Sequence, residues 1–398
     1  MRALSVVTSV AVLLACLWSF APAAASGTVS FWTQNATNPA MLAVLESFTR
    51  ETGIDVDLRA ISYNLDELLV AFAAESPPDI FTHGGAALGA IASLDVLLPL
   101  DLYFERWDFT KDILPAVLEY GRYEGALVTV PIHGVSVRDL VFRKDLIEEA
   151  GLDSRRPFPR WDDLARDGQK LVRIGPNGVM QRSALNIGVG DQQFSMFYHQ
   201  SGGSLSRDGG PHLDVDPADQ ALTFYHSLIH QLRLWDINFS GDLTVGTTAM
   251  SWAAPSLFYR GLDDGLLGVS TFPYSDKPAT FGAVDWMAVT KGAKNLEGAL
   301  ALLEYTLRPE QKQILTQEFG GIPIYRHALE WDWLQEHQEV IAHFMSAFEY
   351  AVPNPSHRFW FDQRAVLRAM VDKVIRSGEP PRNAVLQARE QIEALWHQ

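Results

Sequence analysis

The sequence predicts two α/β lobes that are joined by several crossings of the chain. Its length of 398 residues exceeds what one small core needs, because domains usually hold about 100–200 residues. Strand and helix signals alternate along much of the chain, which is typical of α/β folds. The sequence has neither an internal repeat of fixed period nor a long linker, so we expect interwoven lobes rather than separate domains in a row.

Residues 28–85 carry the clearest alternation. The predicted strands are residues 28–33, 54–58 and 79–82, and the predicted helices are residues 39–52 and 64–75. Asn38 and Pro39 form a typical helix start, and Gly53 a typical helix end. This β-α-β-α-β order implies parallel strands, and ligands bind outside the carboxyl ends of such strands. The ends lie at residues 33–35, 62–64 and 83–85.

The rest of the chain continues the pattern. Further predicted strands are residues 126–132, 140–142, 247–252 and 283–289. Further predicted helices are residues 145–150, 217–232, 296–307, 310–319, 363–375 and 382–396. The α/β signals therefore extend to the end of the sequence.

The N-terminus has the pattern of an export signal. Residues 1–25 begin with Arg2, continue as an apolar run and end in small residues, which predicts a secretory signal peptide cleaved after about Ala25. The alternative is a lipid anchor at Cys16, because Leu13-Leu14-Ala15-Cys16 is similar to a bacterial lipobox. Both predict a periplasmic location.

Composition and motifs exclude several classes of function. A formal charge of −16 repels phosphate backbones, so we expect no nucleic-acid partner. One Cys excludes internal disulfides and Cys-based zinc sites. The catalytic motifs GxSxG, GxxxxGK[ST], GxGxxG and HExxH do not occur. His226 and His230 lie four residues apart, but no third ligand stands at a motif spacing, so we expect no metal and no cofactor.

Aromatic residues give the positive signal. They make up 11% of the chain, with 11 Trp, and several fall at predicted strand ends or loops. These are Trp32, Tyr63, Trp107, Trp252, Trp286, Tyr325 and Trp360. Aromatic rings suit the apolar faces of sugars, although large aromatics more often fill cores.

Several segments together resemble a known family. They include SFWTQN, AESPPDIFTHGG, ALVTVPIHGVSVRDLVFRKDLIEEAGLD, FYHQSGGSLSRDGG, VGTTAMSW, AVDWMAVTKGAKNLEGALALLEYTL, FGGIPIY and SGEPPRNAVLQAREQI. Their order over about 370 residues is similar to that of the family 1 extracellular solute-binding proteins of bacterial ABC importers, a group that includes maltose-binding and glycerol-3-phosphate-binding proteins.

The resemblance implies a type II clamshell in which each lobe holds a mainly parallel sheet. Residues 26–135 and 284–322 would form lobe I, and residues 136–283 and 323–398 would form lobe II. The expected crossings lie near residues 133–137, 281–285 and 320–325. The ligand would lie between the lobes, a membrane permease would be the partner, and the protein would be a monomer.

By motif position, the resemblance also implies a set of ligand-binding residues. They are Trp32, Asn35, Tyr63, Asn64, His83, Gly84, His133, Ser136, Arg138, Trp252, Asp285, Trp286, Gly321 and Tyr325. The glycines would let the backbone approach a ligand closely. Asp191 and Gln192 are secondary candidates, whereas Trp161 matches the family as a packing residue.

The chain departs from the family pattern at two places. Many relatives carry Tyr-Asn where this chain has Phe142-Arg143, which we expect to change lobe packing. Many carry Gly-Gly where this chain has Phe281-Gly282, which changes the backbone expected at the second crossing.

The leading hypothesis is a non-catalytic receptor for a carbohydrate or polyol. Arg138 and His83 together would favour an anionic ligand such as a sugar acid or glycerol phosphate. An exported carbohydrate-active enzyme would need two carboxylates about 5–10 Å apart, and the candidate cleft offers only Asp285 as a strong acid. An adhesin or signalling receptor domain would share the fold.

Overall fold

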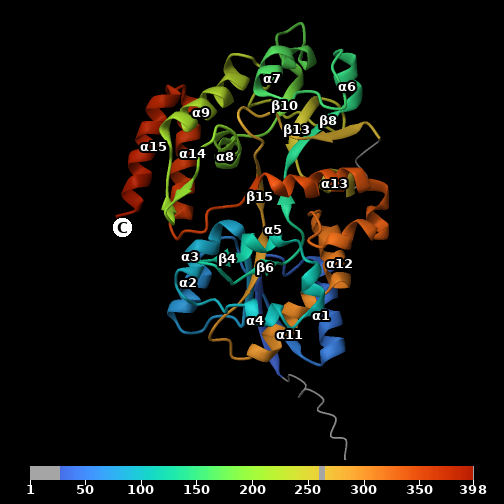
Figure 1. The fold of residues 1–398 in the computed structure, drawn as a ribbon, viewed down its shortest axis with the longest axis vertical. Helices are drawn as coiled ribbons and strands as arrows, with labels where there is room; N and C mark the ends of the chain where they lie inside the picture. Colours follow the sequence, from blue (N-terminus) through green and yellow to red (C-terminus); the bar gives the residue numbers. More distant parts are fainter. Residues whose placement is uncertain (1–26, 260–264, 398) are drawn as a thin grey trace, which may run out of the picture.

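The protein folds around two sheets that lie one above the other. The computed structural model describes residues 27–259 and 265–397. Figure 1 shows a helix group around each sheet, with strand β15 (Thr280–Ala283) and helix α13 (Gln338–Ser346) between the groups. The expected α/β class is confirmed. The predicted signal peptide and Cys16 lie outside the described residues.

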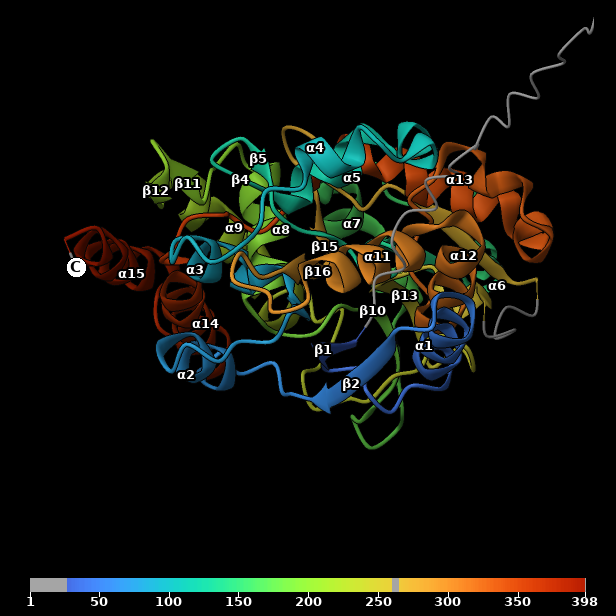
Figure 2. The ribbon, with the colours of Figure 1, turned by 90° about the horizontal axis from the view of Figure 1, so that it is seen from below.

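The first sheet contains the strands that surround the candidate site. Its order is β2 (Asp55–Ala60), β1 (Thr28–Thr33), β3 (Ile80–Gly84), β16 (Asp285–Val289) and β6 (Val130–Pro131). Strands β1, β2 and β3 are parallel, and β16 is antiparallel to both neighbours. Figure 2 shows β2 at the edge of this sheet. The helices around it are α1 (Pro39–Thr52), α2 (Asp66–Ala73), α3 (Leu88–Ala92), α4 (Asp101–Phe104), α5 (Pro115–Leu118), α11 (Leu296–Leu307) and α12 (Pro309–Phe319).

The second sheet is more mixed than expected. Its order is β14 (Leu267–Ser270), β8 (Asp139–Arg143), β13 (Thr248–Ala253), β10 (Met180–Asn186) and β9 (Arg173–Ile174). Only β10 and β13 pair in parallel. The expectation of a mainly parallel second sheet is therefore corrected. Strand β8 follows directly after the first segment that connects the two sheets, with no helix before it. Antiparallel strands can pair without the helical connection that parallel strands need.

Helices cover the second sheet and end the chain. They are α6 (Lys144–Glu149), α7 (Trp161–Asp167), α8 (Asp191–Gln200), α9 (Val215–His230), α14 (Trp360–Ser377) and α15 (Pro381–Leu395). The remaining short elements are α10 (Ser256–Tyr259), β4 (Arg122–Tyr123), β5 (Ala126–Leu127), β7 (Ser136–Val137), β11 (Ser206–Arg207), β12 (Gly210–Pro211) and β17 (Ala351–Val352). The 3-10 segments are η1 (Gly85–Ala87), η2 (Asp108–Asp112), η3 (Glu119–Gly121), η4 (Gly168–Leu171), η5 (Arg326–Glu330), η6 (Asp332–His337) and η7 (Ala347–Glu349). Among the described residues, no helix is both long enough and apolar enough to cross a membrane.

Helix α1 forms where the sequence predicts it. The Asn38 side chain accepts a hydrogen bond from the Met41 N–H at 3.1 Å, and Pro39 opens the first turn. Gly53 ends the helix with φ 74°, a left-handed angle that glycine adopts readily. Met41, Val44, Leu45 and Phe48 are its buried residues, as their helical spacing requires.

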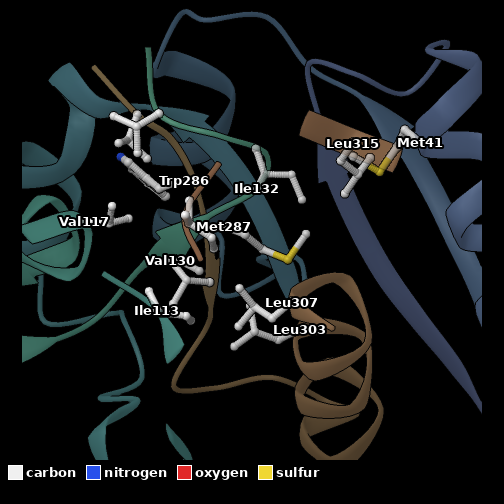
Figure 3. Packing of buried hydrophobic residues seen from close by; sticks show 14 of the residues in the cluster. Met41, Ile113, Val117, Val130, Ile132, Trp286, Met287, Leu303, Leu307 and Leu315 are labelled. Carbon is white, nitrogen blue, oxygen red and sulfur yellow. The ribbon is translucent and has the colours of Figure 1, made fainter. Parts of the chain in front are cut away.

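Strand β16 is the centre of the first core. Its side chains alternate between the two faces of the sheet, and Figure 3 shows Met287 beside Leu303 and Leu307 of α11. Trp286 is fully buried and packs edge-on against Phe81 of β3, with ring centroids 5.7 Å apart. This packing fixes the strand whose first residue is Asp285.

Three segments connect the sheets and hydrogen-bond to one another. Strands β7 and β15 pair antiparallel, with Ser136 opposite Ala283. The backbone of Val135 exchanges hydrogen bonds of 2.9 and 2.8 Å with Ile322. The segments expected to cross between lobes thus meet in one small ribbon beside β17. The residue boundaries of the two lobes stay a prediction.

Two predicted elements differ in detail. Helix α9 begins at Val215 and not at Pro217, because the N–H groups of the first turn need no helical partner and a proline fits there. The run 126–132 forms two short strands, because the Gly121 carbonyl accepts the N–H groups of Val128 and Thr129.

Candidate ligand-binding site beside the crossings

Tyr63 and Asp285 form the centre of the candidate site. Tyr63 lies in the loop between β2 and α2, and its hydroxyl donates a hydrogen bond of 2.7 Å to Asp285 Oδ2. Asp285 lies opposite Gly84 in the β3–β16 pair, so both are at the carboxyl end of β3. The Tyr63 side chain is 52% exposed, whereas the Asp285 side chain is 29% exposed. A half-buried carboxylate and an accessible ring therefore lie side by side.

His133 adds a second polar group from the first crossing. Its Nε2 lies 3.6 Å from Asp285 Oδ2, and its ring stacks on Phe319 with centroids 4.5 Å apart. His133 Nδ1 lies 3.0 Å from the carbonyl of Gly134, which can only accept, so Nδ1 carries a proton. Nε2 can then donate toward Asp285 only when the ring is a cation.

The charge of Asp285 follows from these contacts. Burial acts to raise the pKa of Asp285, but the contact with His133 and its charge, followed by the Tyr63 hydrogen bond, lower that pKa below its ordinary value. Burial and the charge of Asp285 raise the pKa of the Tyr63 phenol. At neutral pH the site holds a carboxylate beside a neutral phenol.

His83 lies beneath Tyr63 at the end of β3. Its ring meets the Tyr63 ring edge-on, with centroids 5.9 Å apart, and lies 6.0 Å from the ring of Trp286. The side chain is 1% exposed, and burial lowers the pKa of His83 to about 4. His83 is therefore neutral at pH 7.

The segment just before α14 lies close to the same end of β3. An added Cβ at Gly85 would lie 3.2 Å from Asn354 Nδ2, and an added Cβ at Gly89 would lie 2.3 Å from the carbonyl oxygen of His357. Trp360 Nε1 donates to Asn354 Oδ1 at 3.0 Å, which orients this amide. The two glycines allow direct contact between the halves of the protein.

The comparisons with known proteins identify the family. The model of the family described as "Bacterial extracellular solute-binding protein" matches residues 32–313, which is more than half of the chain. The chain belongs to this family. The resemblance drawn from the sequence is thereby confirmed.

Curated relatives match this solute-binding protein over part of their length. The "sn-glycerol-3-phosphate-binding periplasmic protein UgpB" of Yersinia pestis is 26% identical over 252 residues, covering 56% of this chain and 55% of the relative. That of Yersinia enterocolitica is 28% identical over 233 residues, covering 52% and 51%. The chain thus spans about half the length of the curated relatives it matches.

Solved structures share the fold over nearly the whole chain. The sugar-binding protein MalE from Xanthomonas citri aligns with a TM-score of 0.79 at 23% identity and covers 92% of this chain and 96% of that one. A solute-binding protein from Thermotoga lettingae bound with α-D-tagatose aligns with a TM-score of 0.77 at 21% identity, covering 92% and 99%. These likenesses show the clamshell fold of this solute-binding protein.

Arg138 and Trp252 lie together in the second half, and Ser136 lies in the ribbon of the crossings. Ser136 is half-buried in the β7–β15 ribbon. The guanidinium carbon of Arg138 lies 5.2 Å from the centroid of the Trp252 ring, and no carboxylate of residues 27–259 or 265–397 pairs with this arginine. Trp252 itself is 4% exposed, and its Nε1 donates to Thr280 Oγ1 at 3.0 Å.

Three predicted residues contact groups other than Tyr63 and Asp285. Trp32 lies under Arg59 at 4.2 Å, where it lines a separate hollow of about 470 Å³ beside α2. The backbone N–H of Asn35 donates to Thr33. The Asn64 side chain exchanges hydrogen bonds with Asp66 at the start of α2.

Three others are buried or face backbone. Trp286 and Tyr325 are fully buried, and the Tyr325 hydroxyl donates to the Leu307 carbonyl. An added Cβ at Gly321 would lie 2.8 Å from the Gly134 Cα, so this glycine allows two crossings to touch. In this conformation these residues stabilise the crossings and the core, and their contact with a ligand stays a prediction.

Sequence reasoning missed other polar groups. Asn354 was not named, although the Pro-rich break before α14 and Trp360 mark its position. Asp191, a secondary candidate, is 3% exposed and pairs with Arg364 at 2.7 Å and Arg368 at 2.9 Å. No cluster of three or more His, Cys, Asp or Glu suited to a metal ion occurs within the described parts of the chain.

The buried imidazole of His83 predicts a pH dependence of stability. Its pKa is about 4 when folded and about 6.5 when unfolded, so between these values the unfolded chain binds the extra proton. This contribution to the free energy of unfolding is complete above about pH 6.5. It decreases by about 3 kcal/mol at most as the pH falls toward 4. When the free energy of unfolding in urea is measured as a function of pH across this range, the His83→Gln variant should lack this part of the slope.

The exposed His397 provides the matched control. The His397→Gln variant should retain the wild-type slope. An equal slope in the His83→Gln variant and the wild type would contradict the assignment of a neutral, buried imidazole.

Proposed function

We propose that this chain is an extracytoplasmic receptor that captures a carbohydrate or polyol between two lobes and delivers it to an ABC import permease. The observation that carries the proposal is the polar group of Tyr63, His133 and Asp285 at the carboxyl end of β3, beside the crossings. Hydroxyl-rich ligands need such directional donors and acceptors. In α/β sheets this end of the strands is the usual ligand position.

The arrangement of the halves supports capture by closure. A ligand favours a closed form only when it bonds to both halves, and closure expels water, which strengthens each polar contact. The Tyr63–Asp285 centre would be the ligand-binding part of lobe I, and Arg138 and Asn354 would face it from lobe II. We assign residues 26–135 and 284–322 to lobe I, and residues 136–283 and 323–398 to lobe II.

The names of the relatives agree with a small polar ligand. The curated relatives are named for sn-glycerol-3-phosphate, and the solved structures include complexes with tagatose and maltose. Those ligands belong to those proteins, and their shared chemistry is a run of hydroxyls. We propose export through a signal peptide that ends near Ala25, or retention by lipid at Cys16.

A receptor fits this centre better than a hydrolase. Glycoside hydrolysis normally uses two carboxyl groups about 5–10 Å apart, one on each side of the bond. The centre described here holds one carboxylate, Asp285, which is already bonded to Tyr63. The proposal is therefore capture and release of an unchanged ligand by a monomer without a cofactor.

Titration calorimetry against maltose, D-tagatose, mannotriose, glycerol and sn-glycerol 3-phosphate tests this function. At least one of them should bind one-to-one and be recovered unchanged by chromatography. The Asp285→Asn variant should bind it about tenfold or more weakly, because a hydrogen bond to a charged group is lost. The Asp55→Asn variant, at the exposed edge strand, should bind normally. Consumption of the ligand, or binding of only peptides or metal chelates, would refute the proposal.

Arg138 favours an anionic sugar derivative as the second candidate. Burial lowers the pKa of this arginine, and no described carboxylate neutralises it. The Arg138→Gln variant should lose about tenfold or more in affinity for sn-glycerol 3-phosphate and little for glycerol. The control is Arg59→Gln, since Arg59 also covers a Trp ring but pairs with Glu67 at 3.3 Å. An equal loss for both ligands would exclude an anion site at Arg138.

A further inference from the structure

A second pocket lies between two β-hairpins from different halves of the protein. Hairpin β4–β5 joins the first core through Leu127, and hairpin β11–β12 follows Leu205 of the second core. Figure 2 shows both hairpins on the side of the molecule where α15 ends. The pocket has a volume of about 490 Å³, which suits a small organic ligand, and neither Tyr63 nor Asp285 lines it.

The turns of both hairpins reach this pocket. Glu124 and Gly125 have φ angles of 49° and 86°, and Asp208 and Gly209 have φ angles of 52° and 79°. Left-handed angles at both central residues are typical of the tight turns that suit β-hairpins. Asp-Gly is a common sequence for such a turn, whereas a residue with a long side chain, such as Glu124, adopts this conformation at a cost. The turn places this acidic residue on the wall of the pocket.

The pocket is lined by one acidic and one basic residue, one from each half. Glu124 and Arg358 are both exposed, and neither forms an ion pair within the described part of the chain. Burial raises the pKa of the Tyr123 phenol, the charge of Glu124 raises it further, and the charge of Arg358 lowers it. Two opposite charges therefore act on one hydroxyl of the pocket wall. His357 adds no charge at pH 7, because burial lowers its pKa.

Three aromatic residues give the pocket apolar walls. Tyr123 comes from the first half, and Phe359 lies next to Arg358, whose guanidinium carbon is 4.4 Å from the centroid of the Phe359 ring. Trp396 is 47% exposed, and its indole packs against Gly210, where an added Cβ would overlap the ring. Because the backbone covers one part of this indole, the exposed part is what a planar ligand can cover.

We propose that this pocket binds an aromatic α-amino acid in its zwitterionic form. Arg358 binds the carboxylate, since a guanidinium group can donate two parallel hydrogen bonds to it, and Glu124 binds the ammonium group. The ring of the ligand lies against Trp396. An α-amino acid carries both charged groups on one carbon atom, which matches two opposite charges beside one phenol.

The pair of charges disfavours simpler ligands. An anion without an ammonium group would be repelled by Glu124, and a cation without a carboxylate would be repelled by Arg358. A small amino acid without a ring would leave the aromatic walls in water. The proposal uses none of the residues of the Tyr63–Asp285 centre, so it does not depend on the receptor function proposed above.

Titration calorimetry of the whole protein with matched compounds tests the ligand class. At least one of L-phenylalanine, L-tyrosine and L-tryptophan should bind one-to-one. The analogue of that amino acid without the ammonium group, its analogue without the carboxyl group, and L-alanine should each bind about tenfold or more weakly, because each lacks one of the three contacts. Failure of all three aromatic amino acids to bind, or equal binding of any analogue, would overturn the proposal.

Two variants test the assignment of the charges. Arg358→Gln and Glu124→Gln should each weaken binding of the amino acid about tenfold or more. Arg358→Gln should no longer distinguish the amino acid from its analogue without the carboxyl group. Glu124→Gln should no longer distinguish it from the analogue without the ammonium group. Loss of binding with the discrimination unchanged would contradict direct contacts.

Control variants separate this pocket from other sites. Arg50→Gln, at an exposed arginine of α1, and Glu105→Gln, at an exposed glutamate after α4, should bind the amino acid as the wild type does. Asp285→Asn should also bind the amino acid normally, although it weakens binding of a sugar. An equal loss of amino-acid binding in Asp285→Asn and Arg358→Gln would place the ligand at the Tyr63–Asp285 centre and overturn the proposal.

Discussion

The hydrogen-bonded ribbon of the three crossings is the constraint on which the rest of the structure depends. Val135 pairs with Ile322 while the next residues pair with β15, so no crossing can move alone. Gly134 and Gly321 make this contact possible, because an added Cβ at either would lie within 3 Å of the other's backbone or that of its neighbour. Motion of the halves must then be a change of backbone angles within this ribbon, which is the usual form of hinge closure.

Two buried ionisable side chains make hydrogen bonds at the two ends of the ribbon. Lys312 of α12 is fully buried and donates to the carbonyls of Pro131 and Ile132 at 2.8 and 3.0 Å, just before the first crossing, and burial lowers its pKa to about 7. On the other side, Asp139 begins β8 and accepts from Tyr350 at 2.7 Å and from the Phe272 N–H at 2.6 Å. Truncating either side chain would leave buried polar groups without these hydrogen bonds, so side-chain hydrogen bonds anchor both ends of the hinge.

The sequence predicts elements whose signals are local, and it misses contacts that only tertiary structure creates. The cap and stop of α1 and the span of α11 agree with the structure, because their determinants lie within a few residues. Strand ends brought Tyr63 and His83 into consideration, the family resemblance added Asp285, and the structure places the three together. Asn354 could not be found in this way, because its position opposite Gly85 depends on how the two halves meet. Trp286, which the resemblance assigned to the ligand, packs against Phe81 within the first core.

The account requires that the halves move relative to each other when a ligand binds. Val70 on α2 and Val179 beside β10 are 68% and 56% exposed, and a chain that begins after Ala25 contains no cysteine, so both can be replaced by cysteine and spin-labelled. Pulsed electron paramagnetic resonance then gives the distance between the two spin labels. With a saturating amount of the sugar that binds in calorimetry, we expect a shifted and narrower distance distribution. An unchanged distribution, with the sugar demonstrably bound, would contradict capture by closure.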